Sequence, residues 1–354
     1  MTAERVLMKG NEALAEAAIR AGCKCYFGYP ITPQTEIAAF MAKNMPKRGG
    51  TFLQAESEIA AINMVLGAAS AGVRAMTSSS SPGISLKSEG ISYIAASDLP
   101  CVIINVQRGG PGLGGIQPAQ ADYWQAVKSG GHGDFHILVF APNSVQEMAD
   151  MVVKAFEKAD RYRIPAMILS DGMLGQMMEP VVFPEISDKM PEKPWATNGH
   201  GNKRKHNIIN TLFLQPDELE ASVSARSKKY ETIVENEQDA EVYLTDDADI
   251  VVTAYGAVSR ICREAVDEAR KNGIKAGLLR PKVLWPFPVK DYQKIVPTAK
   301  SILCVELSTG QMIDDVKLAV NCSVPVEFYG RTGGNLPSAD EIIKKLAEIN
   351  DSLS

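Results

Sequence analysis

The amino-acid sequence predicts an α/β protein made of two successive units of alternating strands and helices, joined by a polar segment. In the first ~185 residues, apolar strand-like runs alternate with stretches of helical spacing, as in a mainly parallel sheet covered on both faces. Residues 186–247 are polar and charged, and a second alternation fills residues 248–354. A chain of 354 residues is long enough for two such domains.

The first unit opens with a helix predicted over residues 11–21, where alanine and leucine recur at helical spacing. Residues 25–29 form a short predicted strand. Thr32 is the expected N-cap of the next helix, and Pro33 would occupy its first helical position. Near Thr32 we therefore expect a strand to end and a helix to begin shortly afterwards.

An alanine-rich helix is predicted over residues 56–71, followed by a strand over 73–77 and a loop over 78–83. Residues 100–106 form a near-continuous apolar run, as a buried parallel strand requires. The glycine-rich segment 109–115 must be a loop. The other elements predicted in this unit are the strands 137–140 and 166–169 and the helix 144–158.

The stretch from 186 to 247 contains prolines, glycines and many charged residues, with one amphipathic helix near 218–235. We interpret it as a connector rather than a domain. The second unit is predicted to contain the strands 250–255, 276–279, 301–306 and 324–328 and the helix 259–272.

Composition excludes several classes of protein. The apolar fraction of 45% and the charged fraction of 22% are those of an ordinary globular protein. A net charge of −5 argues against nucleic-acid binding. No apolar run approaches the ~18 residues of a membrane span, and the N-terminus lacks a signal-peptide core, so we expect a cytoplasmic protein. The absence of a C-x-x-C-x-x-C run argues against an iron–sulfur cluster in this chain.

Three polar features lie at predicted strand ends, where open α/β sheets bind ligands. They are Thr32, the serine-rich loop 78–83, and Arg108 directly after the strand 100–106. Each has a simpler explanation on its own, namely a helix cap, a polar turn and a surface ion-pair former. Their shared position at strand ends is what makes them candidates.

Two carboxylates, Glu56 and Glu58, begin the alanine-rich helix. On spacing alone, both could face solvent in the first turn, where acidic residues favour the helix dipole. A carboxylate at the mouth of a closely packed helix would otherwise need a partner, because burying it is costly. Glu58 precedes Gly67 by nine residues.

Several short segments occur in one order along the chain: Gly10-Asn11-Glu12-Ala13, Tyr29-Pro30-Ile31-Thr32-Pro33, Ala55-Glu56-Ser57-Glu58-Ile59-Ala60, Ser81-Pro82-Gly83, Gln107-Arg108-Gly109-Gly110-Pro111, Gly131-His132-Gly133-Asp134, Tyr255-Gly256-Ala257-Val258-Ser259-Arg260 and Arg280-Pro281-Lys282-Val283-Leu284-Trp285-Pro286-Phe287-Pro288. This series resembles the alpha subunit of 2-oxoacid:ferredoxin oxidoreductases. The resemblance implies a thiamine diphosphate-binding fold of the pyrimidine-binding type over residues 1–185 and a transketolase C-terminal-like domain over 248–354.

The resemblance also implies roles for matched residues. Glu58 resembles the glutamate that hydrogen-bonds the aminopyrimidine nitrogen of thiamine diphosphate and promotes the tautomer that removes the thiazolium proton. Glu56 is its rival, but the spacing of nine to Gly67 favours Glu58. Thr32 and Arg108 resemble the substrate-binding pair, in which a guanidinium donates two parallel hydrogen bonds to a carboxylate. The implied cofactor-binding residues are Glu58, Pro30, Ile31, Ser81, Pro82 and Gly83.

The chain has no Gly-Asp-Gly motif for the cation on the diphosphate, since Ser170 precedes Asp171-Gly172. The resemblance therefore implies a beta subunit that carries Mg²⁺ and the diphosphate site, and gamma and ferredoxin-like delta subunits, with iron–sulfur clusters on the partners. His132, Asp134 and His136 form an H-x-D-x-H pattern, but zinc normally needs a third or fourth well-spaced ligand. We expect no metal site in this chain.

The implied reaction is oxidative decarboxylation of a 2-oxoacid with coenzyme A, giving acyl-CoA, carbon dioxide and reduced ferredoxin. Two segments look closest to the 3-methyl-2-oxobutanoate type, Ser78-Ser79-Ser80-Ser81-Pro82-Gly83 and Gly130-Gly131-His132-Gly133-Asp134. The 2-oxoglutarate type is the near alternative and pyruvate the third. Two other classes stay open, a non-catalytic thiamine-binding scaffold subunit and a carboligase half without ferredoxin.

Overall fold

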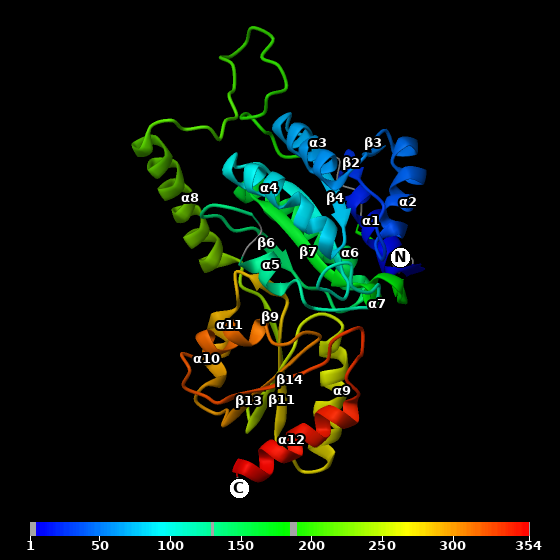
Figure 1. The fold of residues 1–354 in the computed structure, drawn as a ribbon, viewed down its shortest axis with the longest axis vertical. Helices are drawn as coiled ribbons and strands as arrows, with labels where there is room; N and C mark the ends of the chain where they lie inside the picture. Colours follow the sequence, from blue (N-terminus) through cyan, green and yellow to red (C-terminus); the bar gives the residue numbers. More distant parts are fainter. Residues whose placement is uncertain (1–4, 129–130, 185–189, 354) are drawn as a thin grey trace.

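The computed structural model describes residues 5–128, 131–184 and 190–353. They form two lobes stacked along the long axis of the molecule, with a seven-stranded sheet in the N-terminal lobe and a five-stranded sheet in the C-terminal lobe (Figure 1). Both sheets are mainly parallel, so the predicted α/β class is confirmed.

The seven-stranded sheet has the order β12-β6-β7-β5-β4-β2-β3, and every neighbouring pair is parallel except β12 with β6. All residues of the central strands β5 and β7 are buried, which explains their continuous apolar sequences. The strands are β2 (Cys25–Gly28), β3 (Thr51–Gln54), β4 (Ala75–Ser79), β5 (Cys101–Gln107), β6 (Leu138–Phe140), β7 (Pro165–Asp171) and β12 (Val283–Trp285).

Helices cover both faces of this sheet. Alternate residues of β5 point to opposite sides, where they join two different apolar clusters. One face packs against α1 (Gly10–Arg20), α2 (Thr35–Asn44) and α6 (Val145–Tyr162), and the other against α3 (Glu58–Ser70), α4 (Ser81–Ala96) and α5 (Tyr123–Val127). Smaller elements are β1 (Val6–Lys9), which pairs with β8 (Met178–Val181), the 3-10 helix η1 (Pro46–Arg48) and α7 (Gly172–Gln176).

The C-terminal lobe is a second three-layer sandwich. Its sheet has the order β14-β13-β10-β11-β9, with only β9 antiparallel. The strands are β9 (Ala240–Tyr243), β10 (Ile250–Thr253), β11 (Ala276–Pro281), β13 (Ser301–Glu306) and β14 (Val326–Gly330). One face packs against α9 (Val258–Lys271) and α12 (Ala339–Leu353), and the other against α10 (Val289–Ile295) and α11 (Met312–Ala319). The cluster under α10 and α11 continues into the N-terminal lobe, so one apolar core links both sheets.

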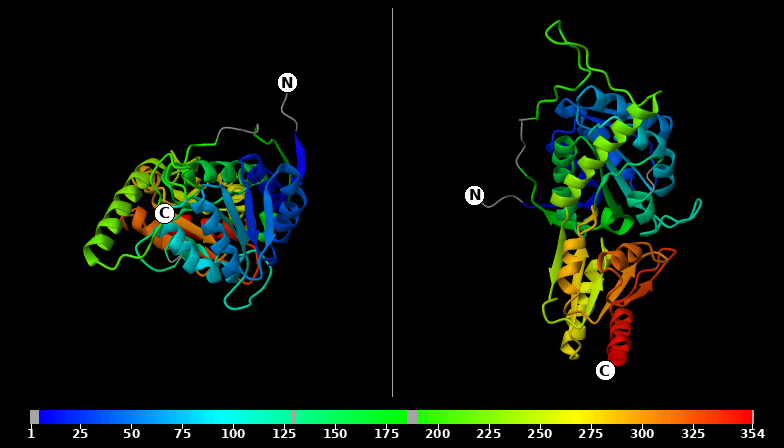
Figure 2. Two further views of the ribbon diagram at one scale, coloured as in Figure 1. Left: turned by 90° about the horizontal axis from the view of Figure 1, so that it is seen from above. Right: turned by 90° about the vertical axis from the view of Figure 1, so that its left-hand side faces the viewer.

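Between the lobes in sequence, α8 (Pro216–Asn236) lies along the side of the N-terminal lobe, and a long loop projects beyond it (Figure 2). Two edge strands cross the predicted domain limit at 247/248: β9 precedes it but joins the C-terminal sheet, and β12 follows it but joins the N-terminal sheet. The predicted limit at 185/186 lies outside the described residues. The division into 1–185, 186–247 and 248–354 therefore stays a prediction. Among the described helices, none combines the length and apolar character that a bilayer crossing demands.

Two local predictions were wrong. Thr32 does not cap α2, because the helix begins only at Thr35, and Gln34 occupies the N-cap position. The buried Gln34 side chain donates to the Tyr29 carbonyl (3.1 Å), which holds residues 29–34 in a turn of their own.

Residues 78–83 are not a loop either. Ser78 and Ser79 are buried residues of β4, paired with Ile104 and Asn105, and α4 starts at Ser81. Pro82 fits the first turn of that helix, where no intrahelical N–H bond is lost. Parallel pairing with β5 therefore extends the strand into the serine run, which local polarity alone does not predict.

A buried arginine joins the lobes. Arg280, at the end of β11, donates two hydrogen bonds to the Glu147 carboxylate of α6 (2.7 and 2.9 Å) and one to Glu241 of β9 (2.7 Å). Its side chain is only 3% exposed, whereas those of Glu147 and Glu241 are 22% and 27% exposed. A bidentate pair of this kind fixes orientation as well as contributing energy.

We expect Arg280→Met to lower the free energy of unfolding by about 2 kcal/mol, because the Glu147 carboxylate loses its ion pair and Glu241 keeps only its pair with Arg263. The partial exposure of both glutamates keeps the loss below that of a fully buried pair. Thermal unfolding would measure it, with Lys271→Met as the control, since Lys271 pairs with Glu268 on the surface. Equal melting temperatures of the two variants would contradict a stabilising role for the Arg280 network.

Candidate active site

Glu58 is the first residue of α3 and is buried, with only 6% of its surface exposed. Ser57 caps the helix by accepting a hydrogen bond from the Ala60 N–H (3.2 Å), so the helix starts at Glu58. Glu56 lies outside the helix and is exposed. The expectation that both carboxylates could face solvent is therefore wrong for Glu58 and confirmed for Glu56.

The first turn of α4 packs directly against Glu58. A Cβ atom added to Gly83 would lie 2.7 Å from Glu58 Oε1 and 2.1 Å from Ser79 Oγ. Only glycine leaves room for this approach. The structure thus brings Gly83, with Ser81 and Pro82 in the same turn, to the candidate carboxylate.

Arg108 and Thr32 also meet. Arg108 follows β5, is buried (7% exposed), and its guanidinium donates to the Thr32 carbonyl (3.0 Å) and to the Leu113 carbonyl (3.2 Å). Its backbone N–H donates to Ser81 Oγ (3.0 Å). Three of the sequence candidates therefore form one connected group, although the contact to Thr32 is through its backbone rather than its hydroxyl.

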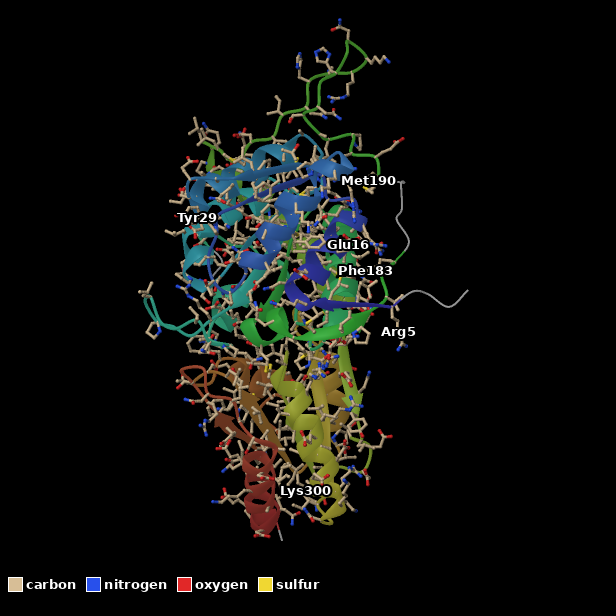
Figure 3. The ribbon with its side chains drawn as sticks, turned by 90° about the vertical axis from the view of Figure 1, so that its right-hand side faces the viewer. Arg5, Glu16, Tyr29, Phe183, Met190 and Lys300 are labelled. Carbon is tan, nitrogen blue, oxygen red and sulfur yellow. The ribbon has the colours of Figure 1, made fainter. Side chains whose placement is uncertain are left out.

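Pro30 and Ile31 follow the end of β2, at the same edge of the sheet as Thr32. Pro30 is exposed and Ile31 half-buried, and neither side chain hydrogen-bonds to Glu58, since proline and isoleucine side chains carry no donor or acceptor. The preceding Tyr29 is 37% exposed and lies at the edge of the N-terminal lobe (Figure 3). Their role in cofactor binding stays a prediction.

Sequence reasoning missed Asp122, which anchors the group. Asp122 accepts hydrogen bonds from Ser81 Oγ (2.6 Å) and Asn105 Nδ2 (3.0 Å). Burial raises the pKa of Asp122, while these two hydrogen bonds and the charge of Arg108 act against the rise. Asp122 follows a glycine-rich loop with no local pattern, so only the folded chain reveals it.

Sequence reasoning also missed Lys87, a fully buried lysine on α4. Its Nζ donates to Thr77 Oγ1 (3.0 Å) and to the Ser78 carbonyl (3.2 Å). A signal existed, because Ile84 and Ile91 place Lys87 on the apolar face of the helix.

Two cavities open beside these residues. One of about 720 Å³ lies between the lobes and the other, of about 580 Å³, adjoins Thr32. The first is lined by residues including Ser81, Pro82, Gly109, Asp122, Ser308 and Thr332, and the second by residues including Thr32, Thr35, Glu36, Ile116, Gln117 and Gly334. No lysine or arginine is among the described residues that line either cavity.

The polar side chains at this end of the sheet fit an aminopyrimidine ring. Within the described part of the chain, no hydrogen bond or ion pair holds the Glu58 carboxylate, although it is buried. Nearby, Ser79 Oγ, Ser80 Oγ and Arg108 Nε are buried without a hydrogen-bond partner among the described residues. Buried polar groups are normally satisfied, so unsatisfied ones grouped at a strand end point to a ligand.

Asp171 has a structural role. It caps α7 by accepting from the Met173 N–H (2.8 Å) and the Leu174 N–H (3.1 Å), and burial raises its pKa to about 6. Oδ1 of Asp171 is therefore engaged at the start of α7.

His136 stacks on the Trp285 ring, with ring centroids 4.5 Å apart, and His132 contacts the edge of Tyr93. Burial lowers the pKa of His136. No group of three or more potential metal ligands occurs among residues 5–128, 131–184 and 190–353. Gly130, part of the segment Gly130–Asp134, lies outside those residues.

Family models match both lobes. The model described as pyruvate flavodoxin/ferredoxin oxidoreductase, thiamine diP-bdg, matches residues 16–242, and pyruvate:ferredoxin oxidoreductase core domain II matches residues 248–342. The ketoisovalerate oxidoreductase subunit VorB of Methanothermobacter marburgensis is 50% identical, over 97% of this chain and 97% of its own. The chain belongs to the 2-oxoacid:ferredoxin oxidoreductase family. The predicted family is thereby confirmed.

More distant members of the family are similar too. The 2-oxoglutarate synthase subunit KorA of the same organism is 36% identical over 97% of this chain and 98% of its own. The solved structure of a 2-oxoglutarate:ferredoxin oxidoreductase from Magnetococcus marinus, with 2-oxoglutarate, coenzyme A and succinyl-CoA bound, superposes with a TM-score of 0.87 at 28% identity. It covers 98% of this chain, which spans 65% of the length of that one.

A split-gene transketolase shares the fold, with a TM-score of 0.61 at 15% identity over 96% of this chain and 97% of its own. The predicted fold class, a thiamine diphosphate-binding domain followed by a transketolase C-terminal-like domain, is confirmed by these matches.

Proposed function

We propose that this chain is the subunit of a 2-oxoacid:ferredoxin oxidoreductase that holds the pyrimidine end of thiamine diphosphate. The observation that carries the proposal is the buried Glu58 carboxylate, which has no hydrogen-bond partner within the described residues and faces the glycine turn of α4. When bound, the cofactor supplies the carbanion chemistry that decarboxylation of a 2-oxoacid requires.

The residues of the site have separate tasks in this proposal. Glu58 exchanges a proton with the ring nitrogen through its carboxylate. The turn Ser81-Pro82-Gly83 and the segment Pro30-Ile31 form the walls of the pyrimidine site. Arg108 binds the substrate carboxylate, and the Thr32 hydroxyl binds either that carboxylate or the 2-oxo oxygen. Arg108 Nε has no hydrogen-bond partner among the described residues and is a donor for the substrate.

Partner subunits complete the enzyme. We infer a beta subunit with Mg²⁺ and the diphosphate site, because the chain has no Gly-Asp-Gly motif and Asp171 is used as a helix cap. Iron–sulfur clusters, gamma and ferredoxin-like delta subunits, and docking sites for ferredoxin and coenzyme A complete the assembly. The cysteines of the described residues are all free, as is usual in the reducing cytoplasm, where we place the enzyme.

We propose 3-methyl-2-oxobutanoate (ketoisovalerate) as the substrate. The VorB relatives carry the ketoisovalerate name at 50% and 49% identity, against 36% for a KorA relative.

We therefore expect kcat/KM for 3-methyl-2-oxobutanoate to exceed that for 2-oxoglutarate by at least about tenfold. The native complex would be purified and ferredoxin reduction measured with a panel of 2-oxoacids and coenzyme A. A preference for 2-oxoglutarate would contradict the proposed substrate, while bound cofactor without any ferredoxin reduction would indicate a carboligase or a scaffold subunit.

A further inference from the structure

Lys87 is a charged side chain in an unusual place. It is completely buried on α4, and its Nζ donates to one hydroxyl, Thr77 Oγ1, and one carbonyl, that of Ser78. An ammonium has three N–H donors, so one is left without a hydrogen-bond partner among the residues that the structure describes. Burying a charge is costly unless a charge of opposite sign compensates for it.

The backbone geometry places Glu58 on the same side. Gly83 and Lys87 are four residues apart on α4 and therefore share one face of the helix. Gly83 approaches Glu58 Oε1 and Ser79 Oγ closely enough that a Cβ atom would clash with both. Lys87 binds the two residues of β4 that precede Ser79. The ammonium and the carboxylate thus lie at the same end of β4, inside the protein.

Their charges interact. Burial lowers the pKa of Lys87 to about 8, and the carboxylate of Glu58 acts in the opposite direction. The α4 helix packs against α3, β5 and β7, and its Lys87 side chain binds β4. Among the described residues of these elements, Glu58 of α3 is the charged group that acts on Lys87. The contacts of Lys87 on β4 are to neutral groups, the Thr77 hydroxyl and the Ser78 carbonyl.

We propose that Lys87 is a positioning residue, the buried counter-charge whose attraction keeps the Glu58 carboxylate directed at the pyrimidine ring. This inference rests on the proposed function, because it assigns Glu58 to the cofactor. An ammonium nearby stabilises the ionised form of a carboxylate.

The test is the affinity of the assembled complex for thiamine diphosphate, measured by calorimetry on both sides of pH 8. Below that pH Lys87 is charged and supports Glu58, and above it the support is lost as the ammonium deprotonates. We expect the wild-type dissociation constant to rise through this range. Lys87→Met should bind about tenfold more weakly at the lower pH and show no such rise, since a tenfold change corresponds to one lost charge interaction of about 1.4 kcal/mol.

A double-mutant cycle separates this role from simple packing. In a Glu58→Gln background, Lys87→Met should have no further effect on cofactor affinity. An equal loss in both backgrounds, or a wild-type pH profile in Lys87→Met, would overturn the inference. Should Lys87→Met fail to assemble, Lys87→Gln and the wild-type profile provide the same comparison. Full activity of Glu58→Gln alone would instead refute the proposed function, so the two failures are distinct.

Discussion

The complex carrying Glu58→Gln should lose about 1,000-fold in kcat, within the range that general acid–base groups contribute. Glutamine keeps the size of the side chain, so the packing of the α4 turn against it is preserved. The amide cannot exchange a proton with the ring nitrogen. Ferredoxin reduction under saturating cofactor and substrate measures the loss directly, without confusion from weaker binding.

Glu56→Gln is the matched control. Glu56 lies two residues earlier and is exposed, so the same change of charge there should leave kcat within about twofold of wild type, as for most surface substitutions. A fully active Glu58→Gln complex would show that another group activates the cofactor. Inactivation by Glu56→Gln would reverse the assignment of the two carboxylates.

Arg108→Ala should lower kcat/KM for the 2-oxoacid by about 100-fold, mainly through KM, because one hydrogen-bonded charge contributes about 1.5–3 kcal/mol. The same change releases the Thr32 and Leu113 carbonyls, which the guanidinium holds at 3.0 and 3.2 Å. Both effects weaken substrate binding in the same direction. Steady-state kinetics at varied 2-oxoacid concentration would measure it.

Arg108→Lys distinguishes charge from geometry. Lysine keeps the charge but not the planar pair of donors, so we expect it to recover only part of the loss. An unchanged KM for every 2-oxoacid in Arg108→Ala would show that Arg108 anchors the loop without touching the substrate.

Local sequence determined much of the molecule. Burial of a strand on both faces leaves a continuous apolar run, as in β5. Burial of a helix on one face leaves an amphipathic repeat, as in α6. The ordered motifs around Glu58, Thr32 and Arg108 predicted the family, since each lies within a short contiguous segment of the chain.

Tertiary structure decided the contacts between distant segments. The burial of Glu58 but not Glu56 depends on the approach of Gly83, some 25 residues later in the chain. The serine run became strand and helix only because β4 pairs with β5. The edge strand β9 comes from the predicted connector and joins the C-terminal sheet, whereas β12 comes from the second unit and joins the N-terminal sheet, which no local pattern reveals.

Lys87 is the clearest example of this division. The sequence places a lysine on the apolar face of a helix, and nothing local says whether it is tolerated or used. Only folding sets it at the end of β4 that Glu58 also occupies, where low polarity makes the two charges act on each other. Periodicity along one chain determines which elements form, whereas electrostatic coupling depends on distances in space.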